Sequence, residues 1–166
     1  MARKYLQIKG LDAYSLMLSR LEAGVNDIAA KAVYEAGAIV ADTTRQEIAA
    51  LPTVTRESRK QQTAGKLDGI TADEKADLSG GFGITPMENK DGTINIKTGF
   101  DGYGSKPTKK YPKGVPNVLL ARAVAKGTSF RLKNDFNKRS IQKSRPAAQK
   151  RMAEVVSAEI AKRMKG

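Results

Sequence analysis

The densest group of carboxylates in this sequence is Asp73, Glu74 and Asp77. Asp73 and Asp77 are four residues apart, so they share one face if the segment is helical. Two carboxylates placed in this way could hold a magnesium ion together with water and a substrate phosphate. Acidic residues are also common in the first turn of a helix, where they stabilise the helix dipole. We favour this second interpretation and expect no metal site.

The residue types that most often carry catalysis are missing. The chain contains no histidine and no cysteine, which excludes the commonest general base, thiolate nucleophiles and cysteine zinc sites. No pairing of serine with lysine or aspartate stands out for nucleophilic catalysis. The glycines between Gly99 and Gly104 match neither the phosphate-loop nor the dinucleotide fingerprint. We therefore expect a protein that is not an enzyme and that has no catalytic residues and no cofactor.

Positive charge is concentrated at the end of the chain. The net charge is +13, and residues 106–166 hold 17 basic and 3 acidic side chains. Residues 1–50 are neutral and residues 51–105 carry a net charge of −1. This asymmetry favours a polyanion or an acidic protein surface as a partner, although a solvated basic face has the same composition.

The candidate interface residues are basic side chains from segments without sustained periodicity. They are Arg56, Arg59, Lys60, Lys109, Lys110, Arg131, Lys133, Lys138 and Arg139.

The first half of the chain is expected to be mainly helical. Alternation predicts a strand over residues 4–10, and apolar spacing predicts a helix from Ala13 to Glu22. A pattern of apolar residues three and four apart, beginning at Val25, predicts a long amphipathic helix that ends before Pro52. Gly37 either is tolerated in this helix, which is the interpretation we favour, or marks a point where a neighbouring backbone comes near. Residues 53–70 are polar and are expected to form a projecting arm.

The second half should contain a hairpin and two helices. Thr71 and Glu74 form a capping box for a short helix over residues 72–78. A hairpin follows, turning at Asp91-Gly92. Asn117 is expected to cap a helix that ends at Gly127, and Ser144 to cap the last helix. Between them, residues 128–143 are expected to be irregular and anchored by three apolar side chains, Phe130, Phe136 and Ile141. The order indicates one α+β domain over residues 1–166, with a small antiparallel sheet packed against a long amphipathic helix and a C-terminal helix.

In its order of motifs the chain resembles the neck proteins of tailed bacteriophages, known as tail-completion or head–tail joining proteins. The likeness is carried by Ile8-Lys9-Gly10-Leu11-Asp12, by the alanine-rich helix through residues 29–50, and by the glycine-flanked hairpin over residues 78–102. It continues in the segment 123–129, which contains Gly127-Thr128-Ser129, then in Phe136 and in Arg145-Pro146-Ala147.

The resemblance implies a virion component without catalytic activity. Such proteins form a ring, often of six subunits, at the junction of the DNA-filled head and the tail. They contact head-side connector proteins and tail-terminator or tail-tube proteins, and DNA passes through the channel. The chain has no apolar run of membrane-spanning length and no secretory signal pattern. We expect assembly in the reducing cytoplasm of the host bacterium. The alternative hypothesis is a DNA-binding protein that uses the basic segment 106–166.

Overall fold

The computed structural model describes residues 11–55 and 66–165. It is an α+β structure, as predicted, with two long helices, three shorter helices and two small antiparallel sheets. The strand predicted for residues 4–10 lies outside the described residues, as do residues 56–65 of the predicted arm. No helix in the described ranges is long and apolar enough to cross a membrane.

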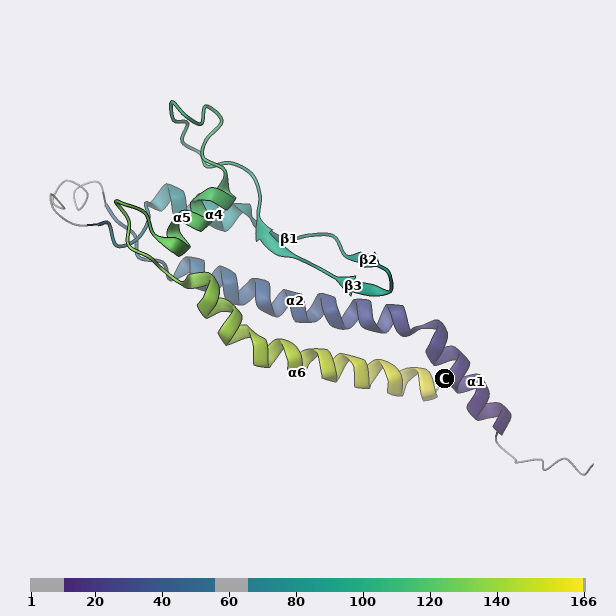
Figure 1. Cartoon of the computed structure of the whole chain (residues 1–166). Coiled ribbons are helices and arrows are strands. Elements are labelled where there is room, and N and C mark those ends of the chain that lie inside the picture. Colours follow the sequence, from purple (N-terminus) through teal and green to yellow (C-terminus); the bar gives the residue numbers. More distant parts are fainter. Residues whose placement is uncertain (1–10, 56–65, 166) are drawn as a thin grey trace, which may run out of the picture.

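Two long antiparallel helices, α2 (Val25–Ala49) and α6 (Phe136–Lys165), lie side by side and form the axis of the molecule (Figure 1). Small residues line their contact, among them Ala32, Ala36 and Ala148. Thr44 and Ser140 share a buried hydrogen bond of 2.5 Å between their hydroxyl groups. Small side chains let the two backbones approach closely, and α2 ends before Pro52 as its sequence predicts. A shorter helix, α1 (Leu11–Ala23), precedes α2 and continues beyond the end of α6 (Figure 1).

The C-terminal helix begins earlier than the sequence analysis predicts. It starts at Phe136, eight residues before Ser144, and Pro146 lies inside it. Ser144 is therefore not a cap but a buried interior residue. Packing against α2 overrides the weak local signal of this polar segment. Of the three predicted anchors only Phe136 is buried, because Phe130 is 57% and Ile141 60% exposed.

The hairpin forms with the predicted turn. Strands β1 (Phe82–Ile84) and β4 (Thr98–Phe100) pair at its base, and strands β2 (Glu88–Lys90) and β3 (Thr93–Asn95) pair near its tip. Asp91 and Gly92 both have positive φ, 52° and 78°, as a tight hairpin turn requires. The hairpin runs along α2 (Figure 1). The side chain of Ile96 occupies the space beside Gly37, so the close neighbour of this glycine is a side chain and not the neighbouring backbone considered above.

The hydrophobic core lies where the end of α2 meets α4 (Ala72–Gly81), α5 (Asn117–Lys126), the base of the hairpin and the start of α6. Thr71 and Glu74 form the predicted capping box. However, α4 continues to Gly81, three residues beyond the end predicted at residue 78. Asn117 is not a cap, because Pro116 occupies the N-cap position and the side-chain amide nitrogen of Asn117 donates a hydrogen bond to the Asp101 carbonyl at 2.8 Å.

The C-terminal end of the predicted arm is part of the body of the protein. Ile70 is fully buried in the core. The Val54 amide donates to the Ile70 carbonyl at 2.8 Å, and the Ile70 amide donates to the Pro52 carbonyl at 2.9 Å. These bonds hold the two described ends of segment 53–70 beside each other.

Candidate interaction surface

Arg131, which the sequence analysis places at an interface, is buried. Its side chain is 4% exposed, and its Nη2 atom donates to both carboxylate oxygens of Glu74, at 2.9 and 3.0 Å. The extended backbone around it is held to Leu67 by two hydrogen bonds of 2.8 Å. Because a buried guanidinium paired with a carboxylate fixes a loop to the body, Arg131 is a structural residue. Its flanking residues, Phe130 and Leu132, are exposed instead.

Arg139 is also engaged within the chain. Its Nε atom donates to Glu47 of α2 at 2.8 Å, and its Nη2 atom donates to Asn134 at 2.8 Å. Lys143, one turn further along α6, donates to the second oxygen of Glu47 at 2.5 Å. The side chain of Glu47 is 7% exposed, and the hydrogen bonds from Lys143 and Arg139 lower the pKa of its carboxyl. Glu47, Arg139 and Lys143 together join α2 to α6.

The remaining described candidates are at the surface. Lys133 is exposed and pairs with Asp135 at 2.9 Å. Lys138 is exposed on the first turns of α6. Lys109 and Lys110 are exposed on the basic loop that joins the hairpin to α5, and this loop projects from the body (Figure 1). The other three candidates, Arg56, Arg59 and Lys60, lie outside the described residues.

The basic loop, defined here as residues 104–116, has a fixed base. The Gly104 amide donates to the Val115 carbonyl at 2.8 Å, and Gly114 has a φ of 97°. A Cβ at Gly114 would lie 1.8 Å from the Gly104 carbonyl oxygen, so only glycine fits there. The base therefore presents the lysines of the loop at a fixed position above α4 and α5.

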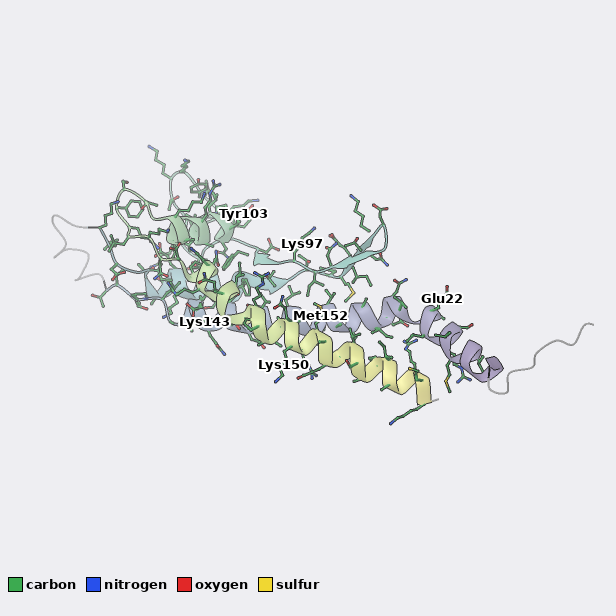
Figure 2. The ribbon with its side chains drawn as sticks, turned by 60° about the horizontal axis from the view of Figure 1, so that its bottom comes forward. Glu22, Lys97, Tyr103, Lys143, Lys150 and Met152 are labelled. Carbon is green, nitrogen blue, oxygen red and sulfur yellow. The ribbon has the colours of Figure 1, made fainter. Side chains whose placement is uncertain are left out.

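Among the described residues, most of the positive charge that lacks a carboxylate partner is in this loop and on the outer faces of α5 and α6. Between residues 106 and 165, nine exposed basic side chains form no ion pair with any described residue. They are Lys109, Lys110, Lys113, Arg122, Lys126, Lys138, Arg145, Lys162 and Lys165. Lys150, by contrast, approaches Glu154 at 4.0 Å on α6, the helix that also carries Lys143 and Met152 (Figure 2).

Exposed apolar residues, which the sequence patterns did not indicate, lie beside this charge. Val118 and Leu119 on α5 are 56% and 40% exposed. Arg122 and Lys126 follow them at helical spacing. Large exposed apolar side chains beside an arginine are typical of a protein-binding surface.

Each of the three clustered acids has a partner within the described structure. Asp73 pairs with Lys106, Glu74 with Arg131, and Asp77 accepts hydrogen bonds from the amide and hydroxyl of Ser105. No group of three or more metal-ligating side chains occurs among the described residues. The acids therefore stabilise the start of α4 and attach two loops to it.

Comparisons of the chain with protein-family models, with curated proteins and with solved structures return no match.

Proposed function

We propose that this chain is a non-enzymatic structural protein of a tailed bacteriophage. It assembles into a ring, expected to be a hexamer, at the head–tail junction of the virion and surrounds the DNA channel. In this position it joins head-side connector proteins to the tail-terminator or tail-tube proteins, after assembly in the cytoplasm of the host bacterium. The proposal rests on the order of motifs described above and on the character of the surface.

The observation that carries the proposal is the combination of unpaired cations with exposed apolar side chains. Val118, Leu119, Phe130 and Leu132 are each at least 40% exposed, and Arg122 and Lys126 are among the cations without partners. Apolar and arginine side chains together favour binding to a protein, because phosphates alone would need only the charge. An acidic, partly apolar surface of a neighbouring neck protein would match this composition.

A triple charge reversal tests whether the basic loop contacts a neighbouring neck protein. Lys109→Glu, Lys110→Glu and Lys113→Glu change the basic loop without touching a described ion pair. The matched control, Arg20→Glu, Lys66→Glu and Lys90→Glu, changes the net charge equally at exposed positions outside residues 106–166. We expect the loop variant alone to lose ring formation or binding to the connector of the same genome, in electron microscopy and co-sedimentation. Equal behaviour of the two variants would contradict the placement.

A second candidate function is DNA binding, which the projecting basic loop specifically favours. The loop contains four lysines, and Lys110 lies 5.5 Å from the ring centroid of Tyr111. Retention of the subunit on DNA columns over a salt series distinguishes the two functions. We expect retention to vanish by physiological salt. Sequence-specific retention that survives physiological salt and is lost in the loop variant would instead favour DNA binding.

A further inference from the structure

An open groove of about 930 Å³ lies at the base of the hairpin. The last turn of α4, the strands β1 and β4, and residues 101–103 form its walls. Tyr103 stands at this end of the hairpin beside the short helices, whereas Lys97 lies further along the hairpin (Figure 2). Gly80, Gly83 and Gly99 all line the groove.

The fold itself does not require these three glycines. A Cβ added at Gly80, Gly83 or Gly99 would meet no atom within 4 Å, and none of the three has a positive φ. Glycine inside a helix or strand costs roughly 0.5–1 kcal/mol relative to alanine. Gly83 and Gly99 are directly opposite each other in the β1–β4 pair, so the ribbon presents bare main chain there. Such glycines mark places where another backbone approaches closely.

The polar groups of the groove are mainly hydrogen-bond acceptors, which would bind a hydrogen-bond donor. Asn117 is 3% exposed and lines the groove, and its Oδ1 atom has no hydrogen-bond partner among the described residues, although its amide nitrogen donates to Asp101. The lining contains two carboxylates, Asp77 and Asp101, and no lysine or arginine. Tyr103 is 59% exposed at its edge. An extended, positively charged peptide with free backbone N–H groups matches these features.

We propose that the groove of one subunit binds residues 3–10, RKYLQIKG, of a second copy of this chain. The segment carries Arg3, Lys4 and Lys9 and no acid, which complements the acidic groove. Its alternation is that of a strand. In extended form these eight residues span roughly 26 Å.

The position of α1 favours a contact between two subunits, in which the N-terminal segment of one subunit reaches the groove of the next. The segment precedes Leu11, and α1 runs past the end of α6, away from α4 and the groove (Figure 1). The groove of a neighbouring subunit is thus the natural site for it. Repeated contacts of this heterologous kind close into a ring when the rotation allows. This inference deepens the proposed function and rests on its ring of identical subunits.

The absence of cysteine permits a direct cross-linking test. A Gln7→Cys variant is mixed with a Gly99→Cys variant of different tag mass, oxidised, and analysed by non-reducing mass spectrometry. The matched control replaces Gly99→Cys with Thr93→Cys, an exposed position on β3 near the tip of the hairpin. We expect the Gln7–Gly99 cross-link at least tenfold more often than the control. Equal yields would overturn the proposal.

Filling the groove gives an independent readout. Gly83→Val with Gly99→Val should leave the melting temperature unchanged or higher, since both side chains enter open space, while lowering self-association at least tenfold. Thr93→Val is the control and should change neither. Rings that persist without the Gln7–Gly99 cross-link would overturn the contact between residues 3–10 and the groove, but not the proposed ring. A cross-link without rings would keep the contact and overturn the ring.

Discussion

Replacing Arg131 with methionine should destabilise the fold rather than weaken an interface. The change keeps most of the apolar stem and removes the guanidinium that holds Glu74. Glu74 then keeps only its capping contact, the hydrogen bond of 2.9 Å from the Thr71 amide. Lys133→Met is the matched control, because Lys133 is 59% exposed and its pair with Asp135 is at the surface.

The expected size follows from burial. Removing one partner of a buried ion pair costs about 3–5 kcal/mol, and Glu74 is 25% exposed, which places the loss near the lower end, at about 3 kcal/mol. For a chain of this length that corresponds to a fall in melting temperature of roughly 6–12 °C. Exposed ion pairs contribute only about 0–1 kcal/mol, so Lys133→Met should shift the melting temperature by no more than a few degrees.

Urea unfolding followed by circular dichroism measures both variants. Glu74→Gln completes a double-mutant cycle, because glutamine preserves the capping box while removing the charge. We expect a coupling energy between positions 74 and 131 of at least 1 kcal/mol. The reasoning is refuted if Arg131→Met is as stable as wild type, or if it loses assembly while its unfolding curve is unchanged. The second result would restore the interface role that the sequence suggested.

Four further substitutions test other contacts. Gly80→Ala should stabilise the protein by roughly 0.5–1 kcal/mol, whereas Gly81→Ala should destabilise it, because a Cβ there would lie 2.5 Å from a main-chain carbonyl oxygen; urea unfolding of the pair decides this. Glu47, whose pKa is lowered, stabilises the fold fully above its unfolded value near 4.5 and loses that contribution as pH falls through its folded pKa. Glu47→Gln should therefore melt lower than wild type at pH 7, with the difference shrinking in acid, and a constant difference would contradict the assignment. Gly114→Ala should open the base of the basic loop, since its Cβ would meet the Gly104 carbonyl oxygen; faster tryptic cleavage at the loop lysines, compared with wild type, would show this.

The elements that the sequence predicts well are those with local causes. The apolar period of α2 and the position of Pro52 determine that helix and its end. The capping box of Thr71 and Glu74 and the turn at Asp91-Gly92 depend only on residues close in sequence.

The predictions that fail depend on partners distant in sequence. The start of α6 is stabilised by Glu47, 92 residues before Arg139. Arg131 is buried because the carboxylate of Glu74, 57 residues earlier, accepts its hydrogen bonds. Basic composition alone cannot distinguish a cation that faces solvent from one that holds a buried carboxylate. The groove was missed for a similar reason, because Gly83 and Gly99 become opposite neighbours only when β1 pairs with β4.

Electron microscopy combined with native mass spectrometry of the full chain, alone and with the head-side connector protein of the same genome, tests the central proposal most directly. We expect ring-shaped particles with a central channel and a mass that is a multiple of the 17.9 kDa subunit, formed by the chain alone or on the connector. A protein that remains a 17.9 kDa monomer under both conditions, and that never binds the connector, would contradict a role as a neck ring.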